Sequence, residues 1–232
     1  MTSPAGSPPR EPPDAGLVRA AYLGAVREGD RRRAFQVIDE ARGTGLSVGD
    51  IYLEVFQPTL REIGRLWQEN EISVADEHLA TAITQAAMAR LYEQSFAWAP
   101  VEGRTLVAAC VDVERHEVGL RMLCDLLELE GWDTAYLGSA VPIGSLTDIV
   151  RKRRPDVVAL SVALAPHLPQ LRAAIRAVRE DVADTPPLIL VGGRPFVAEP
   201  ELAMQLGADL TARDAVEAVG LLRKHIRSRP AR

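Results

Sequence analysis

The stretch "TLVAACVDVERHEVG", residues 105–119, joins a run of small and apolar residues to a turn of charged ones. The run at 105–111 carries no charge, which is typical of a strand buried in a parallel sheet. The turn that follows holds His116 between two glutamates and ends at Gly119. A helical pattern begins there, so the stretch predicts the first strand-to-helix junction of an α/β domain.

The same succession of an apolar run and a helical pattern recurs downstream. Further apolar runs occur at 134–138, 157–162 and 188–193, with a weaker run at 208–212 before a last helix from about 214 to 228. Alternating strands and helices predict a parallel sheet with helices on both faces. The expected fold of residues 103–230 is therefore a flavodoxin-like or Rossmann-like α/β domain with a five-stranded parallel sheet.

The first part of the chain has a helical period instead. Residues 1–13 are rich in Pro, Ser and Gly and are expected to form a disordered tail. Residues 14–98 are expected to form a four-helix bundle, because they contain amphipathic patterns separated by short loops. The helices are expected at 15–29, 30–45, 48–70 and 75–95. Pro58 predicts a kink in the third helix, and Ser73 is the expected N-cap of the fourth, with Asp76 at its third position.

The composition disfavours several classes of protein. The 232 residues carry a formal net charge of −5 and a pI of about 5.5, which argues against binding nucleic acid through overall charge. Cys110 and Cys124 make no disulfide framework and fit no zinc spacing, which favours a reducing, cytoplasmic setting. The N-terminal residues lack the apolar core of a secretory signal. The longest apolar run is too short to span a bilayer, so no membrane association is expected.

Candidate site residues lie where the predicted strands end. His116, Gly138, Ser161 and Gly192–Gly193 fall at or just after these ends, the edge at which such sheets bind ligands. The turn at 112–119 is too bulky and acidic for the glycine-rich turn of a dinucleotide fold or for a phosphate-binding loop. A phospho-acceptor receiver domain would need an aspartate where the third strand ends in Ser161. A histidine-centred turn that faces a serine and a double glycine remains.

His116 has two interpretations at this point. It can be a helix-capping or surface histidine, which is the ordinary role of a lone histidine. Alternatively, Glu114 points the same way from an extended turn, accepts the Nδ1–H of His116 and leaves a basic Nε2 for a metal. No other His or Cys lies close in the sequence, which disfavours a zinc site with four protein ligands. A single histidine suffices where a macrocycle supplies the remaining ligands.

The spacing of three motifs resembles the cobalamin-binding fold. The first motif has the form Glu-x-His-x-x-Gly at 114–119, Ser161 follows after 41 residues, and Gly192–Gly193 lies 28 residues beyond Ala163. The resemblance implies that His116 is the lower axial ligand of cobalt, in the form in which it displaces the dimethylbenzimidazole base. Ser161 would then hydrogen-bond the buried base, and the two glycines would leave room for it.

This chain departs from the family pattern at two positions. Glu114 stands where Asp is usual, which keeps the carboxylate, and Ala163 stands where Leu or Thr is usual. The resemblance also implies that neighbouring residues contact the cofactor. These residues are Gly119, Val113, Arg115, Glu117, Gly138 and Val162.

A pattern in the predicted bundle narrows the resemblance. Trp67 is followed by nine residues and then by Glu77–His78, which is similar to the cobalamin-dependent photoreceptors, in which a helical bundle caps the upper face of the corrin. The resemblance implies that Trp67 stacks over the upper ligand, that Glu77 accepts hydrogen bonds from a ribose or an amide, and that His78 is a candidate upper axial ligand. The alternative is that Trp67 anchors the core and that Glu77–His78 is a solvated pair.

The resemblance implies a light sensor and not an enzyme. Visible light would cleave the weak cobalt–carbon bond of adenosylcobalamin, and the bundle would then shift against the sheet. No winged-helix domain precedes the bundle, so we expect no direct DNA binding. The signal is expected to pass to an unidentified protein partner or through a homo-oligomer, with a dimer favoured. A bilin such as biliverdin is an optional second chromophore, because some free-standing members of the group bind one.

Other features limit or compete with this interpretation. Gln68 stands where some members have a histidine that binds cobalt after illumination, so a light-formed bis-histidine adduct would need His78 or another histidine. A corrinoid carrier subunit for methyl transfer is the main alternative, and the cobalamin domain of a mutase, which would require a separate catalytic subunit, is a third. His167 is expected to be a loop residue at the start of a helix, and His225 to be exposed to solvent.

Overall fold

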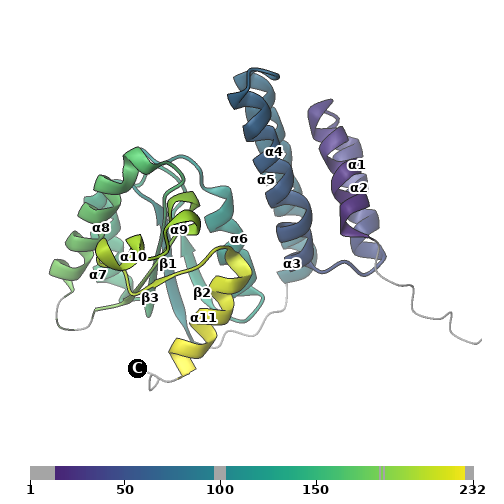
Figure 1. The fold of residues 1–232 in the computed structure, drawn as a ribbon. Helices are drawn as coiled ribbons and strands as arrows, with labels where there is room; N and C mark the ends of the chain where they lie inside the picture. Colours follow the sequence, from purple (N-terminus) through teal and green to yellow (C-terminus); the bar gives the residue numbers. More distant parts are fainter. Residues whose placement is uncertain (1–13, 97–102, 183, 185, 228–232) are drawn as a thin grey trace, which may run out of the picture. The chain divides into compact units, whose positions relative to one another are not determined.

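The computed structural model of the chain describes residues 14–96, 103–182, 184 and 186–227 (Figure 1). The chain divides into two units, Met1–Gln94 and Ser95–Arg232. The disordered tail that the sequence predicts at 1–13 lies outside the described residues. The described part of the first unit is helical, and the second contains the parallel sheet.

Successive helices make up the first unit. They are α1 (Ala15–Arg27), α2 (Arg31–Gly43), α3 (Val48–Asp50), the π-helical segment η1 (Ile51–Phe56), α4 (Gln57–Gln68) and α5 (Val74–Phe96). Because α3, η1 and α4 follow one another without a break, they correspond to the single long helix that the sequence predicts. Aspartates cap the first two helices: Asp14 accepts from the N–H of Gly16 at 2.7 Å, and Asp30 from that of Arg33 at 3.0 Å.

The third helical stretch accommodates its proline through a local change of helix type. η1 ends at Phe56, and Pro58 lies in the first turn of α4. Proline has no N–H to donate to the preceding turn, so a regular α-helix would leave a carbonyl without its partner. The wider π-helical turn places this interruption at the junction between two helix types, where the hydrogen-bond register already changes.

Aromatic residues fill the core of the bundle. Tyr22 of α1 and Phe56 of η1 are fully buried, and their ring centroids lie 4.9 Å apart. The hydroxyl of Tyr22 donates to Thr84 Oγ1 of α5 at 3.1 Å. Burial raises the pKa of Tyr22, so the hydroxyl stays protonated at neutral pH. This hydrogen bond therefore ties α1 to α5 in the interior of the unit.

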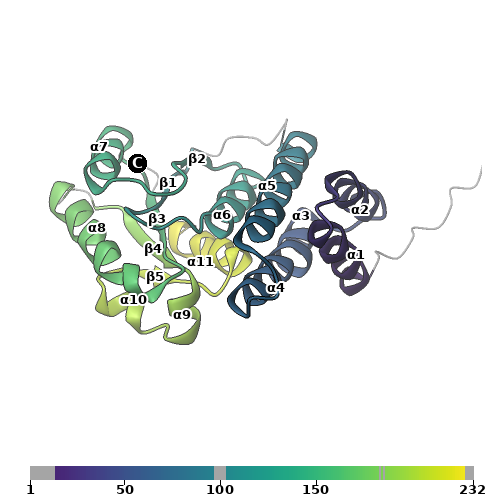
Figure 2. The same ribbon diagram turned by 90° about the horizontal axis from the view of Figure 1, so that it is seen from above.

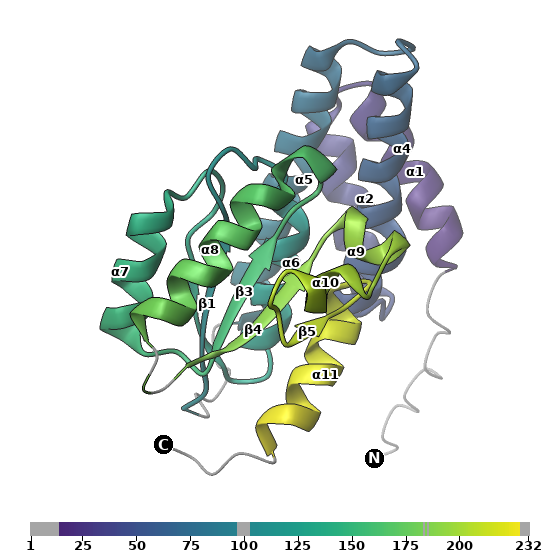
Figure 3. The same cartoon turned by 60° about the vertical axis from the view of Figure 1, so that its left-hand side comes forward.

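The second unit holds a five-stranded parallel sheet (Figure 3). The strands are β1 (Thr105–Cys110), β2 (Asp133–Tyr136), β3 (Val157–Ser161), β4 (Leu188–Gly192) and β5 (Leu210–Thr211). Their order is β2-β1-β3-β4-β5, and each neighbouring pair is parallel. This is the flavodoxin-like order, so the fold class predicted from the sequence is confirmed.

Helices cover both faces of the sheet (Figure 2). They are α6 (Val118–Glu128), α7 (Ile143–Arg153), α8 (Leu168–Asp181), α9 (Arg194–Ala198), α10 (Leu202–Gln205) and α11 (Ala215–Arg227), with a 3₁₀ turn η2 (Ala165–His167) before α8. α7 packs beside α8 on one face, and α6 packs beside α11 on the other. Both faces are thus covered, which explains why the strands are continuous apolar runs. Among the described helices, none is long and apolar enough to cross a bilayer.

Candidate functional site

The chain changes direction between β1 and β3, which are neighbours in the sheet. From β1 it crosses to β2 at one edge, and from β3 it crosses to β4, toward the other edge. Cys110 and Ser161 are register partners at the carboxyl ends of β1 and β3, so the loops that follow them start side by side and then diverge. In open α/β sheets, such a topological switch point is where ligands bind.

His116 lies in the loop after β1 with its ring held from one side. Its Nδ1 is 2.5 Å from Glu114 Oε1, and its backbone N–H donates to the same oxygen at 2.9 Å. An ionised carboxylate only accepts hydrogen bonds, so Nδ1 carries the proton. The side chain of His116 is 56% exposed. In the neutral ring, Nε2 is therefore the unprotonated nitrogen, which is the form of nitrogen that can act as a metal ligand.

The carboxylate of Glu114 is fully buried and joins two loops. Its Oε2 accepts hydrogen bonds from Ala163 N and from His167 Nδ1, both at 2.9 Å. Burial by itself raises the pKa of Glu114, but the hydrogen bonds from His116, His167 and Ala163 outweigh burial and hold the pKa well below its usual range. Glu114 is therefore ionised at neutral pH, with four donors around its charge.

His167 is a member of this cluster that sequence reasoning missed. Its place as a loop residue before a helix is confirmed, since it ends η2 directly before α8. No motif marked it as a partner of Glu114, 53 residues away in the chain. The signal that could have found it is its position in the loop after β3, because this loop and the β1 loop start from adjacent strands.

The end of β4 leaves an open space beside the switch point. Ser161, the last residue of β3, is in register with Gly192, the last residue of β4. A Cβ added at Gly192 would meet no atom of the described chain within 4 Å. Gly193 is different, because its φ is 119° and a Cβ there would lie 1.8 Å from the carbonyl oxygen of Val162. Gly193 thus permits a positive φ and the close approach of the Val162 carbonyl, whereas Gly192 leaves the space beside it open.

Two more of the predicted glycines lie at the same edge. Gly119 is the second residue of α6, and its added Cβ would also have no described neighbour within 4 Å. Gly138 follows β2 with a φ of 77°, and a Cβ there would lie 3.1 Å from Glu117 Oε2. Gly119 therefore leaves space at the start of α6, and Gly138 permits a left-handed turn close to Glu117.

Exposed apolar side chains occur in the segments that follow the strands. Val113, Leu164 and Val197 come after β1, β3 and β4, and are 50%, 39% and 45% exposed. Arg115 is also exposed. Val162 differs from these residues, because its side chain is fully buried in the core and only its backbone is available at the site. Apolar surface near a few placed polar groups is typical of a cofactor site.

The predicted residues of the first unit lie close to the loop between α4 and α5. Trp67 near the end of α4 is 43% exposed, which excludes a purely core role. The predicted capping box is present: Asp76 N donates to Ser73 Oγ at 3.2 Å, and Ser73 N to Asp76 Oδ2 at 2.9 Å. His78 Nδ1 lies 2.5 Å from Glu77 Oε2, and the His78 side chain is 74% exposed. The Glu77 side chain is only 27% exposed and also accepts from Thr81 Oγ1 at 3.0 Å, so His78 is the solvated member of this pair.

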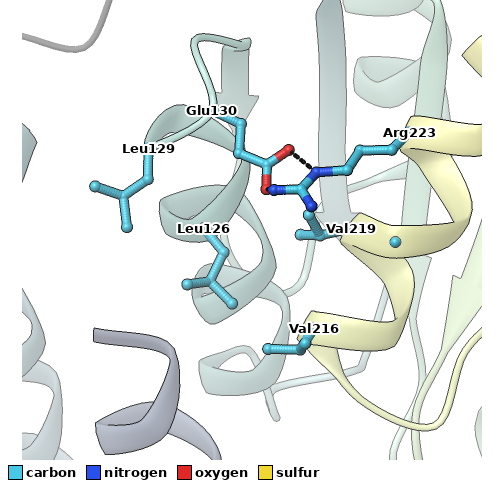
Figure 4. A pocket seen from close by; sticks show the side chains of 7 residues that line it. Leu126, Leu129, Glu130, Val216, Val219 and Arg223 are labelled. Atoms are coloured by element: carbon cyan, nitrogen blue, oxygen red, sulfur yellow. Dashed lines mark hydrogen bonds and ion pairs between the residues drawn. The ribbon is translucent and has the colours of Figure 1, made fainter. Parts of the chain in front are cut away.

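A separate hollow lies between α6 and α11 (Figure 4). Its volume is about 300 Å³, and its walls are mainly apolar. They are formed by Leu126, Leu129, Val216, Val219 and Gly220, with Glu130 and Arg223 ion-paired beside them. None of the site residues predicted from the sequence lines it.

The fold and the site together define a class of protein. A single imidazole oriented by a buried carboxylate, at the switch point of a flavodoxin-like sheet and beside a clear space at the strand ends, suits a metal macrocycle with a pendant base. This is the class of corrinoid-binding proteins. Residues 18–92 and 104–220 each match a family model described as a B12 binding domain. The chain belongs to this family and is a cobalamin-binding protein.

Curated relatives carry two kinds of name. The HTH-type transcriptional repressors CarA and CarH of Myxococcus xanthus are 32% and 30% identical, over 80% and 78% of this chain. This chain covers 61% and 59% of their lengths, about three fifths. Dimethylamine corrinoid protein 1 of Methanosarcina acetivorans is 24% identical over 84% of this chain and 91% of its own length. The predicted kinship with the cobalamin-binding family is confirmed.

A solved structure shares the fold. The monomethylamine corrinoid protein of Methanosarcina barkeri superposes with a TM-score of 0.77 over 91% of this chain and 100% of that chain, at 17% sequence identity. At this identity the likeness concerns the architecture, a helical part followed by the parallel sheet. The choice between a regulator and a carrier rests on other observations.

Proposed function

We propose that this protein is a light sensor that binds adenosylcobalamin and signals through a change at the upper face of the corrin. The observation that carries the proposal is the exposed imidazole of His116, oriented by the buried Glu114 at the switch point of the sheet. Two facts favour a sensor over a carrier: Trp67 is exposed and precedes Glu77–His78 with nine residues between them, and the chain is 32% identical to a transcriptional repressor.

His116 is the proposed lower axial ligand of cobalt. Its Nδ1 is engaged by Glu114, so Nε2 is the nitrogen that would bind the metal, with a basicity increased by the carboxylate. The displaced benzimidazole tail is proposed to enter the space at Gly192, where Ser161 at the end of β3 offers a hydroxyl. The exposed apolar residues that follow the strands, such as Val113 and Leu164, would then lie against the macrocycle.

The helical unit is proposed to cover the upper face. Trp67 offers a broad flat surface to the upper ligand, and the Glu77 carboxylate can accept hydrogen bonds from a ribose or an amide. His78 is the candidate upper ligand once the adenosyl group has left, because Gln68 beside Trp67 cannot replace an imidazole. In this arrangement, contacts with the cofactor would replace the contacts that the exposed His78 of the Glu77–His78 pair makes with water.

In this proposal, signal transmission depends on a difference between the two faces of the cofactor, of which only the upper one changes in the light. Bound adenosylcobalamin supplies a cobalt–carbon bond that visible light cleaves. His116 would hold the cobalt in both the dark and the lit state, whereas Trp67 and Glu77 would face a pocket whose contents change. A bundle that packs differently on the emptied pocket would alter binding to a second copy, with a dimer expected, or to a protein partner.

The decisive test compares spectra of the loaded protein in the dark and after green or blue light. We expect illumination to change both the absorption spectrum and the elution volume on a sizing column. If light changes neither, the sensor proposal is wrong. Parallel samples with added biliverdin test the optional second chromophore, because a bound bilin would add a strong red band.

The lower ligand has its own test. His116→Ala should lose tight cobalamin binding, or bind the cofactor without the spectrum of histidine ligation. His225→Ala is the matched control, since His225 is exposed on α11 and belongs to no motif. A normal spectrum of histidine ligation in His116→Ala would refute the assignment.

A corrinoid carrier subunit for methyl transfer is the second candidate. It is favoured by one specific observation: a protein named dimethylamine corrinoid protein 1 is 24% identical over 84% of this chain. A carrier must open its upper face to a methyltransferase and does not need Trp67, Glu77 and His78 together. Methyl transfer from loaded protein to a thiol acceptor, unchanged in Trp67→Ala and without any light response, would favour the carrier.

A further inference from the structure

The carboxylate of Glu114 is shared by two histidines from different loops. His116 Nδ1 lies 2.5 Å from Oε1, and His167 Nδ1 lies 2.9 Å from Oε2. We propose that His167 is a positioning residue for the cobalt-binding imidazole, which it aligns by holding Glu114 in place. The inference rests on the proposed function, because it takes His116 to be the cobalt ligand.

Each carboxylate oxygen of Glu114 accepts hydrogen bonds from a different loop. Oε1 accepts from the backbone N–H and the Nδ1 of His116, both in the β1 loop. Oε2 accepts from Ala163 N and His167 Nδ1, both after β3. A carboxylate has about four lone-pair sites, so this set of donors saturates it. His167 is thus the side chain that fixes the oxygen facing away from His116.

His167 is itself held in a well-defined position. Its backbone N–H donates to Leu164 O at 3.0 Å, which closes the 3₁₀ turn η2. Pro166 directly precedes it and Pro169 follows after Leu168, and both prolines restrict the backbone of this segment. Its side chain is only 19% exposed, much less than that of His116. The His167 ring therefore has little conformational freedom, and its hydrogen bond restricts the orientation of the Glu114 carboxylate.

Loss of the His167 donor would change how Glu114 holds His116. Oε2 would keep only the Ala163 N–H, so the buried charge would be less well compensated. The terminal torsion of a glutamate is soft, so the carboxylate plane could turn. A turned carboxylate misaligns the ring of His116. Partners of this kind behind a metal ligand typically change metal affinity by about 10–100-fold.

The first experiment needs no cofactor. In protein labelled with ¹⁵N-histidine, two-bond nitrogen–proton correlations report which ring nitrogen of His116 carries the proton. We expect a single Nδ1–H tautomer in the unmodified protein and a mixture of tautomers in His167→Leu. His167→Asn should restore the single tautomer, because its amide nitrogen occupies nearly the position of Nδ1. An unchanged His116 signal in His167→Leu would overturn the proposal.

The second experiment uses the full chain loaded with cob(II)alamin. Electron paramagnetic resonance of the ¹⁵N-histidine protein distinguishes a histidine ligand from the cofactor's own base by the splitting of each cobalt line. We expect His167→Leu to bind cobalamin about 10-fold more weakly or worse, with the histidine splitting reduced. His167→Asn should recover most of both, while His225→Leu leaves both unchanged. Equal losses in the Leu and Asn variants would refute a positioning role.

The two proposals fail in different ways. If His116→Ala keeps the histidine splitting and normal affinity, His116 is not the lower ligand, and both proposals are overturned. If His116→Ala loses the splitting while His167→Leu keeps the splitting, the affinity and the His116 tautomer, only the role of His167 is overturned. Circular dichroism of each variant confirms that the comparison concerns folded protein.

Discussion

Two adjacent glycines at the end of β4 serve different purposes. The resemblance to the cobalamin-binding fold implies that both glycines leave room for the base of the cofactor. In the structure, only Gly192 borders open space, since a Cβ at Gly193 would strike the carbonyl oxygen of Val162 at 1.8 Å. The double glycine therefore combines an open space, in which we propose that the base binds, with a requirement of the backbone.

This difference predicts opposite behaviour for two alanine substitutions. Gly192→Ala should fold with an unchanged melting temperature but bind cobalamin more weakly, because the added methyl group enters the space proposed for the base. Gly193→Ala should lose stability, because its φ of 119° and the close carbonyl both disfavour a side chain. Thermal melts of the cofactor-free protein and cobalamin titrations measure the two effects. Equal affinity in Gly192→Ala would show that the base does not bind there.

Substitution of Glu114 is expected to lower the stability of the protein even without cofactor. Glu114→Gln keeps the size of the side chain but places an amide N–H₂ group against a pair of donors. Leaving buried polar groups unpaired in this way costs roughly 1–3 kcal/mol. Urea denaturation of the cofactor-free protein measures the change. Glu180→Gln is the control, since both members of its ion pair with Arg176 are exposed and such a pair adds little to stability.

The burial of the two cysteines predicts that their thiols react with a thiol reagent only after the protein has unfolded. Burial, followed by the charges of Glu114 and Glu117, raises the pKa of Cys110 to about 12, and burial raises that of Cys124. Both thiols are therefore protonated at neutral pH, and both are shielded from solvent. We expect neither to react with Ellman's reagent at pH 8 in the native protein and both to react in denaturant. Rapid reaction in native protein would contradict the described packing.

At the scale of elements, the start of α5 depends on a short polar cap. Ser73 and Asp76 exchange hydrogen bonds that satisfy free N–H groups of the first turn. Ser73→Ala should lower the melting temperature of the first unit, Met1–Gln94, by roughly 4–8 °C, because loss of an N-cap costs about 1 kcal/mol and the unit is small. Gln94, which is exposed near the other end of α5, offers a control substitution on the same helix. An unchanged melting temperature would mean that packing alone sets this helix boundary.

The same cap gives a pH dependence with a definite sign. The hydrogen bonds from Ser73 lower the pKa of Asp76. A carboxyl group whose pKa is lower in the folded state stabilises above its unfolded pKa, and this contribution is lost as the pH falls through the folded value. The stability difference between the protein and Ser73→Ala should therefore shrink on acidification. Melts at neutral pH and near pH 3 test this, and a constant difference would contradict it.

At the scale of the whole molecule, the proposal divides the cofactor's two faces between two units. Trp67→Ala should abolish the light-driven change in elution volume, because the upper pocket loses its flat cover. The spectrum of histidine ligation should stay unchanged, since His116 lies in the other unit. Leu17→Ala removes another exposed apolar side chain from the first unit and is the control. A normal light response in Trp67→Ala would exclude this role of the bundle.

The sequence by itself determined the succession of helices and strands and the family, but not the π-helical segment Ile51–Phe56 inside the third predicted helix. Buried parallel strands are continuous apolar runs, and a helix start such as Ser73 has a local polar signature, so both are visible without a structure. Motif spacing is also a linear property, which is why residues 114–119, Ser161 and Gly192–Gly193 identified a cobalamin-binding protein.

Only the tertiary structure decided which residues meet. His167 contacts Glu114 across 53 residues because β1 and β3 are adjacent and their loops start side by side, and no local pattern encodes that adjacency. The separate tasks of Gly192 and Gly193 likewise depend on the carbonyl of Val162, which the sheet register brings close to β4. A hydrogen bond or a steric contact between distant segments exists only once the sheet has set their register.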